Sequence, residues 1–158
     1  MENFTVTSIG RVLNDENGMR IVLEKEVIPA LTHMEGFGYL HVLWWFHQND
    51  NDRSRHKLTE SRPYKNSPDI LGTFATRSPE RPNPIALTCA YVTDIDCENG
   101  ILTLAYIDAE NGTPVLDIKP YTPSFDRVEN PIVPQWCSHW PNSVESSGDF
   151  DWESVFNF

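Results

Sequence analysis

The alternation of apolar and polar positions along the chain predicts short β-strands that are joined by turns. Ile85–Asp96 alternates throughout, residues 98–100 form a turn, and residues 101–107 alternate again. Because Asn-Gly between two alternating runs is a strong hairpin signal, this stretch predicts a β-hairpin. The same pattern predicts further strands at residues 4–12, 19–27, 39–47, 71–76 and 115–118.

Other stretches of the chain break this pattern. Residues 49–69 are polar and are predicted to form a long loop, which inside a compact domain is more often functional than idle. Residues 77–84 hold three prolines, which exclude regular structure, and residues 29–35 are expected to form one helical turn. Short strands with little helix favour an all-β fold, a single antiparallel β-barrel, over a sandwich or an α/β sheet.

We expect the barrel domain to cover residues 3–138, followed by an acidic, aromatic C-terminal tail at residues 139–158. No Lys or Arg follows Arg127, whereas Trp136, Trp140 and Trp152 all lie beyond it. Aromatic residues at this density predict that the end of the chain docks on the body of the protein or on a partner.

Composition narrows the class of protein. The chain has 158 residues and a formal net charge of -11, which fits one domain with a real core. No stretch approaches the ~20 consecutive apolar residues of a membrane span, and the N-terminus does not have the pattern of a secretory signal. The three cysteines are not spaced as Cys-x-x-Cys, which indicates reduced thiols in a cytoplasmic protein. The five histidines lack the spacing of a zinc site, so no metal is expected.

The net charge argues against a nucleic-acid-binding protein, but the charges are unevenly distributed. Seven of the twelve basic residues fall between Arg53 and Arg81, a segment with a net charge of +4, so the rest of the chain carries -15. This segment is either a solvated surface loop or a local, positively charged surface that binds an anionic substrate. Its candidate substrate-binding residues are Arg53, Arg55, Lys57, Arg81 and Asn83.

Three segments contain residues suited to chemistry. In residues 72–87, three prolines restrict the backbone around Arg77, Arg81 and Asn83; these planar donors either recognise a ligand or bind nearby carbonyls. Asp117 and Lys119 alternate along a short strand and point to the same face, where they could also pair with each other. Residues 45–48, Trp-Phe-His-Gln, place polar groups at the end of an aromatic strand, as a small-molecule pocket requires.

Two of these motifs resemble those of a known family. The run Gly-Thr-Phe-Ala-Thr-Arg-Ser-Pro-Glu-Arg-Pro-Asn-Pro-Ile, followed by Asn-Gly-Thr-Pro-Val-Leu-Asp-Ile-Lys-Pro-Tyr, is similar to the TsaA-like family, also called the YaeB family. The resemblance covers about residues 3–127. It implies a β-barrel that binds S-adenosylmethionine, methylates N6 of threonylcarbamoyl-adenosine beside the anticodon of certain tRNAs, and acts as a homodimer.

The resemblance also implies a set of cofactor-binding residues. His47 and Gln48 match the family's histidine–amide pair, and Arg77 matches the arginine of its Ala-Thr-Arg motif. Leu87 follows the Pro-Asn-Pro-Ile motif, and Ile107 and Asp108 precede Gly-Thr-Pro. The full set is His47, Gln48, Arg77, Leu87, Ile107, Asp108, Asp117 and Lys119.

The residue types agree with this cofactor, which carries a sulfonium cation, an α-amino acid and an adenine. Asp108 or Asp117 suits the positive groups, and Arg77 or Lys119 suits the carboxylate. Trp44, Trp45 or Phe74 suits the adenine or the sulfonium. Methyl transfer is an in-line displacement, in which positioning alone can supply ~7–11 kcal/mol. The candidates for a catalytic base are His47, Asp117 and Tyr121.

The leading hypothesis is therefore an S-adenosylmethionine-dependent tRNA methyltransferase. The alternatives are a non-catalytic S-adenosylmethionine-binding module and a methyltransferase that acts on a small metabolite. Two features depart from the family pattern. Ala86 stands where relatives usually have Gly, which predicts strain if that position has a positive φ. The Pro-x-Gln segment that many relatives carry after the first strand is missing.

Overall fold

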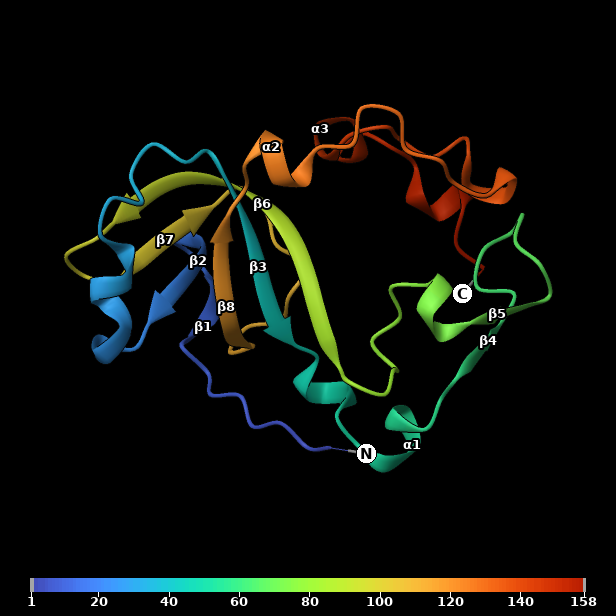
Figure 1. Ribbon diagram of the computed structural model, residues 1–158, viewed down its shortest axis with the longest axis horizontal. Coiled ribbons are helices and arrows are strands. Elements are labelled where there is room, and N and C mark those ends of the chain that lie inside the picture. The colour runs from blue at the N-terminus through green and yellow to red at the C-terminus, as the bar shows by residue number, and fades with distance from the viewer. Residues whose placement is uncertain (1, 158) are drawn as a thin grey trace. The chain divides into compact units, whose positions relative to one another are not determined.

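Six strands close into an antiparallel β-barrel in the computed structural model, which describes residues 2–157 (Figure 1). The strands are β1 (Gly10–Asp15), β2 (Gly18–Leu23), β3 (Tyr39–Trp45), β6 (Ile85–Asp96), β7 (Ile101–Leu104) and β8 (Pro114–Pro120). Their order around the barrel is β1-β2-β7-β6-β3-β8. The predicted all-β barrel is confirmed.

The chain divides into two compact units. Residues 2–48 and 84–127 form the barrel unit, and residues 49–83 and 128–157 form what we call the hairpin–tail unit. The expected boundary between a domain at 3–138 and a tail at 139–158 remains a prediction. No helix among residues 2–157 is long and apolar enough to cross a membrane.

The barrel core follows from the alternation seen in the sequence. Along β3, Leu40, Val42 and Trp44 are buried, whereas the residues between them are partly exposed. Strand β6 places Ala86, Ala90 and Val92 in the same core, next to β3. The Trp44 indole Nε1 donates a hydrogen bond to Thr88 Oγ1 at 3.0 Å, so this large ring is buried with its polar atom satisfied.

Several predicted strands begin or end at other residues than expected. Residues 4–9 form no strand: Phe4 and Val6 are largely exposed, and backbone hydrogen bonds to the neighbouring strands begin at Ile9, whose N–H donates to the carbonyl of Val115. Strand β2 stops at Leu23 because a 3-10 helix, Lys25–Leu31, follows it and contains Pro29. Strand β7 stops at Leu104, and β8 extends one residue earlier and two later than expected.

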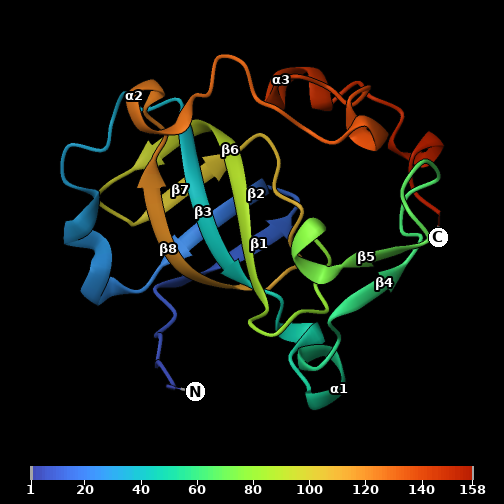
Figure 2. The same cartoon turned by 45° about the vertical axis from the view of Figure 1, so that its right-hand side comes forward.

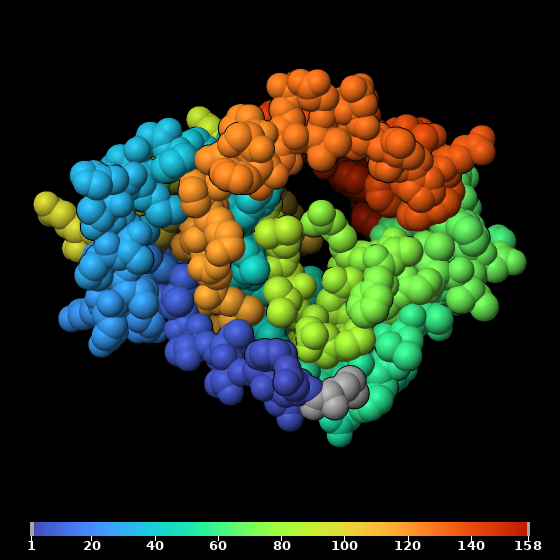
Figure 3. Space-filling view, in the orientation of Figure 1, coloured from blue at the N-terminus to red at the C-terminus, as the bar shows by residue number. Residues whose placement is uncertain are grey.

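The segment after β2 covers one side of the barrel (Figure 3, light blue). Leu31 is buried in the core, and Val27 and Met34 pack against it. The β6–β7 turn meets this cover at Gly100, which has φ +71° and lies close to the side chain of Ile28. The predicted turn at residues 98–100 is therefore also a packing position.

Ala86 is accommodated without the strain expected from its place in the motif. It lies inside β6, opposite Trp44, and is buried. Among residues 2–157, the non-glycine residues with positive φ are His33 and Arg62. Position 86 is thus ordinary strand backbone, which any residue with a small side chain can adopt.

The hairpin–tail unit contains α1 (Asp52–Arg55) and a two-stranded hairpin of β4 (Thr59–Ser61) and β5 (Ile70–Gly72). The expected loop at 49–69 and strand at 71–76 were therefore only partly correct, and Thr73–Ala75 is a 3-10 turn. After α2 (Pro123–Asp126) in the barrel unit, the tail forms 3-10 turns at Gln135–Cys137 and Trp152–Ser154 and α3 (Val144–Ser147).

The end of the chain docks on the turn of the β4–β5 hairpin (Figure 2). The Lys65 N–H donates to the carbonyl of Val155 at 2.9 Å, and the Asn157 N–H donates to the carbonyl of Pro63 at 3.1 Å. Tyr64 lies within an aromatic cluster with Trp136, Trp140, Trp152, Phe150 and Phe156. The tail therefore packs on the hairpin within the hairpin–tail unit, and docking on a partner stays a prediction.

Candidate functional site

The polar end of β3 and the start of β8 lie at the same end of the barrel. The two strands run antiparallel, with Trp44 opposite Val115. His47 and Gln48 follow β3 and are exposed, whereas Thr113 precedes β8 and is 1% exposed. Thr113 Oγ1 lies 3.4 Å from His47 Nδ1, a long hydrogen bond that ties the two strand ends together.

Ile107 and Asp108 belong to the connection that leads from β7 into β8. Ile107 is buried in the core, and its N–H donates to Met19 Sδ at 3.3 Å. Asp108 is exposed. Partial burial, together with the neighbouring Asp108 carboxylate, raises the pKa of Tyr106. Ile107 therefore anchors the connection, and Asp108 presents a negative charge on the surface.

Leu87, Asp117 and Lys119 form a separate group on the outer face of the sheet. Leu43 of β3 is opposite Leu87 on one side and Asp117 on the other. Asp117 Oδ2 accepts from Lys119 Nζ at 2.6 Å, which is the pairing that their alternation allowed. Because Leu43 lies two residues before Trp45, where β3 ends, this row lies ~7 Å along β3 from the strand end.

The three candidates for a catalytic base do not lie together. Tyr121 follows β8 and packs against His41, with ring centres 5.6 Å apart, and His41 Nε2 lies 3.2 Å from Asp126 Oδ1. His41 lies four residues, or ~13 Å, before Trp45, where β3 ends, and His47 follows that end, so Tyr121 and His47 lie near opposite ends of the strand. At most one of them can reach a given reacting atom.

The basic residues predicted to bind substrate are partly neutralised within the hairpin–tail unit. Arg55 Nε lies 2.5 Å from Asp50 Oδ1, and Lys57 pairs with both Glu60 and Glu80. The Glu80 and Glu60 carboxylates raise the pKa of Lys57. Arg53 is exposed on α1. Of the three residues, Arg53 is the one best placed to contribute charge to the surface.

The proline-rich segment divides between structural and exposed residues. Arg81 donates to the carbonyls of Ser78, Thr73 and Thr76 at 2.8–3.2 Å, so it fixes the loop in the way that the structural alternative expected. Asn83 and Arg77 are exposed. Arg77 belongs to the hairpin–tail unit, and its place at a cofactor remains a prediction of the resemblance.

Sequence reasoning missed Thr113 as a site residue. It is buried and polar and contacts His47 from the opposite strand end. The signal was its position between a glycine and Pro114 at the start of an alternating run. Among residues 2–157, no group of three or more His, Cys, Asp or Glu side chains is arranged to hold a metal ion.

The chain is thus built around a small, closed antiparallel β-barrel with polar residues at the strand ends. Residues 7–127 match the family model described as the tRNA-methyltransferase O N-terminal domain, and the chain belongs to this family. The family predicted from the sequence motifs is thereby confirmed.

Relatives of the chain differ greatly in length. A human protein named tRNA (adenine(37)-N6)-methyltransferase is 37% identical over 124 residues, which cover 75% of this chain and 27% of the human protein. An S-adenosyl-L-methionine-binding protein of Archaeoglobus fulgidus is 35% identical over 108 residues, which cover 68% of this chain and 72% of the archaeal protein. The crystal structure of TrmO from Pseudomonas aeruginosa superposes with a TM-score of 0.63 and 26% sequence identity. The superposition covers 83% of this chain and 62% of the TrmO chain. The chain thus spans about a quarter of the human relative.

The side chains at the strand ends fit the chemical groups of S-adenosylmethionine. Asp108 supplies an exposed carboxylate for a cation, and His47 and Gln48 supply exposed hydrogen-bonding groups. Phe46 is partly exposed and packs edge-to-face on Trp44, with ring centres 4.7 Å apart. An aromatic surface suits an adenine, and a carboxylate suits a positive charge, so the two kinds of side chain match two parts of this ligand.

Proposed function

We propose that the barrel unit binds S-adenosylmethionine at the ends of β3 and β8 and that the chain methylates tRNA. The observation that carries the proposal is the His47–Thr113 contact, which joins the end of β3 to the start of β8, in a chain that matches the family over residues 7–127. Asp108 is an exposed carboxylate in the connection that leads into β8. The names of the human and archaeal relatives support the same reaction and the same cofactor.

Each part of the site then has a role. Asp108 balances the positive charge of the cofactor, and His47 and Gln48 bind its polar groups. Ile107 and Thr113 are buried and hold these side chains in place. The bound cofactor supplies an electrophilic methyl group. The protein contributes mainly alignment, because a displacement at carbon depends on the relative position of the two reactants.

We propose that the target is N6 of threonylcarbamoyl-adenosine next to the anticodon, as the sequence resemblance implies. The homodimer and the cytoplasmic location also remain predictions of the resemblance. Nucleoside mass spectrometry of tRNA, from cells that lack and regain the gene, tests the target. Loss and recovery of the methylated nucleoside are expected, and an unchanged nucleoside profile would reject this target.

The second candidate function is cofactor binding without catalysis. The Archaeoglobus fulgidus relative favours it, because this chain covers 72% of a protein that is named only for binding. Transfer of a labelled methyl group to tRNA by the purified protein separates the two functions. Stable binding of the cofactor without transfer to any tRNA supports the second function.

Addition of S-adenosylmethionine is expected to raise the midpoint of thermal unfolding. A ligand at 100 times its dissociation constant adds ~2.7 kcal/mol to the free energy of unfolding. For a chain of this size, that corresponds to a shift of roughly 5–10 °C. Differential scanning fluorimetry measures it, with ATP at the same concentration as the control. If millimolar cofactor leaves the midpoint where ATP leaves it, the cofactor assignment is wrong.

Replacing Arg53 with glutamine is expected to weaken tRNA binding and to reduce its salt dependence. Each lost phosphate contact lowers the slope of log affinity against log salt concentration by about 0.7–0.9. Arg62→Gln is the matched control, since Arg62 lies in the same unit but pairs with Asp69. Joint neutralisation of Arg53, Arg55 and Lys57 extends the test, and an unaltered slope in the triple variant would show that this segment is only a solvated loop.

A further inference from the structure

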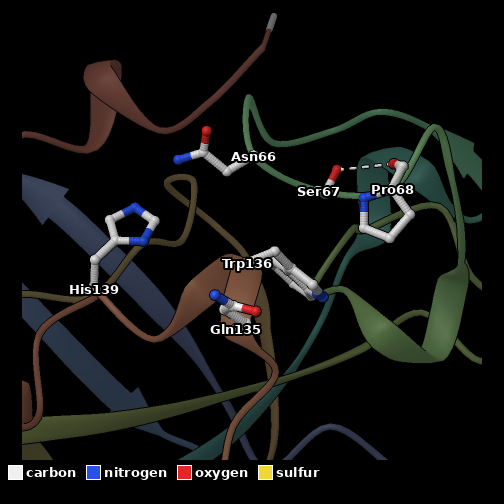
Figure 4. Close-up of a pocket in the computed structure, with 6 residues that line it drawn as sticks. All are labelled: Asn66, Ser67, Pro68, Gln135, Trp136 and His139. Atoms are coloured by element: carbon white, nitrogen blue, oxygen red, sulfur yellow. Dashed lines mark hydrogen bonds between the residues drawn. The ribbon is translucent and has the colours of Figure 1, made fainter.

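A cavity of about 500 Å³ opens within the hairpin–tail unit (Figure 4). The hairpin turn contributes Asn66, Ser67 and Pro68, and the tail contributes Gln135, Trp136 and His139. The tail residues lie beyond residues 7–127, so the family match does not cover them. The volume is within the range of about 300–1,000 Å³ that is usual for small-ligand sites.

Contacts with neighbouring residues hold the walls of the cavity in place. Trp136 stacks on Tyr64, with ring centres 5.4 Å apart and planes inclined by 13°. Burial among these rings raises the pKa of Tyr64. Ser67 is buried, and its hydroxyl donates to the carbonyls of Tyr64 and Pro68 at 2.9 and 3.1 Å. The aromatic wall therefore exists before any ligand binds.

The polar groups around Trp136 are still available to a ligand. The side-chain amides of Asn66 and Gln135 are exposed, and neither has a hydrogen-bond partner within residues 2–157. An amide can both donate and accept, as the edge of a nucleobase requires. Of the six lining residues, His139 alone is titratable, so the cavity suits a flat, uncharged group better than a phosphate.

We propose that this cavity binds one unpaired base of the RNA substrate, stacked against Trp136 and hydrogen-bonded by Asn66 and Gln135. Stacking on aromatic side chains is how proteins hold unpaired bases, and it needs little positive charge at the base itself. This matters here, because the hairpin–tail unit has seven basic against ten acidic residues. The proposal rests on the proposed function, since it takes the substrate to be RNA.

The test is binding of a short RNA hairpin with an unpaired loop, compared with the same hairpin carrying abasic loop positions. Trp136→Leu is expected to weaken binding of the normal hairpin by about tenfold or more, within the range measured for base stacking. Trp136→Phe should retain most of the affinity. The salt slope should stay unchanged in both variants, because no phosphate contact is lost.

A second variant covers the case in which Trp136→Leu unfolds the tail. Asn66→Ala combined with Gln135→Ala leaves the Tyr64 cluster intact and is expected to weaken binding of the normal hairpin at least several-fold. Equal affinity of the wild type for the normal and the abasic hairpins would overturn the proposal and leave the cavity to another occupant. So would equal losses of affinity for both hairpins in the variants.

Failure of this inference is distinguishable from failure of the proposed function. The hairpin experiment is done without cofactor, and methyl transfer to tRNA and the thermal shift are measured separately on the wild-type protein. If the wild type methylates tRNA while the Trp136 and amide variants bind and methylate equally well, the base pocket is wrong and the proposed function stands.

Discussion

Replacing Gly10 with alanine is expected to lower the free energy of unfolding by about 3 kcal/mol. Gly10 is buried in β1, and a Cβ atom there would collide with the carbonyl oxygen of Val22 and lie 2.9 Å from the Cα of Leu23. Both clashing atoms belong to the backbone of β2. No side-chain rotation can relieve them, so the two strands must move apart.

The position of Gly10 makes this separation costly. Gly10 is opposite Leu23 in β2 and also opposite Val115 in β8, so it lies where the barrel closes. The register between β1 and β8 contains only the pairs of Gly10 and Arg11, which makes this the shortest seam of the barrel. Displacement of β1 also disturbs the hydrogen bond from the Val12 N–H to the carbonyl of Thr113. We therefore expect cofactor affinity to fall together with stability.

Urea unfolding followed by far-ultraviolet circular dichroism measures the effect. Gly38→Ala is the matched control, because it lies directly before β3 with an ordinary φ, and its Cβ would meet only the Tyr91 ring at 3.8 Å. The control should change the free energy of unfolding by less than about 0.5 kcal/mol. Similar midpoints for the two alanine variants would show that β1 and β2 tolerate a side chain at Gly10.

Pairing between neighbouring strands explains where the prediction of strands from the sequence succeeded and where it failed. Ile85–Asp96 was predicted with correct bounds because it is paired along its length by β3 and β7, so its alternation reflects burial directly. Phe4 and Val6 alternate similarly but pair with nothing in the barrel, and the strand begins only at Gly10. Alternation reports which face of a strand can be buried, but not whether a neighbouring strand is present.

The candidate site was predictable to a similar extent. The alternation of Asp117 and Lys119 predicted their common face and left their ion pair as one of two alternatives, and this pair is present. The separation of Tyr121 from His47 was not predictable, because it depends on the antiparallel pairing of β3 with β8. The cavity at Trp136 joins residues about 70 positions apart through the packing of Tyr64, which no local pattern encodes.

Asp108→Asn is expected to weaken S-adenosylmethionine binding by about tenfold to 100-fold, the loss typical of a charge-assisted contact. The substitution keeps the size of the side chain, removes its charge and replaces one acceptor oxygen with an NH2 donor. Asp108 is exposed, whereas its neighbour Ile107 anchors the connection, so the fold should be unaffected. Isothermal titration calorimetry measures the affinity, and the unfolding midpoint without ligand checks the fold.

Glu110→Gln is the control for net charge, because Glu110 is an exposed carboxylate in the same connection between β7 and β8. It should leave the affinity nearly unchanged, since an exposed charge that touches no ligand is screened by salt. Titration with S-adenosylhomocysteine, which lacks the sulfonium charge, then shows which positive group of the cofactor Asp108 contacts. A smaller loss for this ligand than for S-adenosylmethionine places the Asp108 carboxylate near the sulfonium, and equal losses place it near the α-ammonium group. Unchanged affinity for both ligands would remove Asp108 from the site.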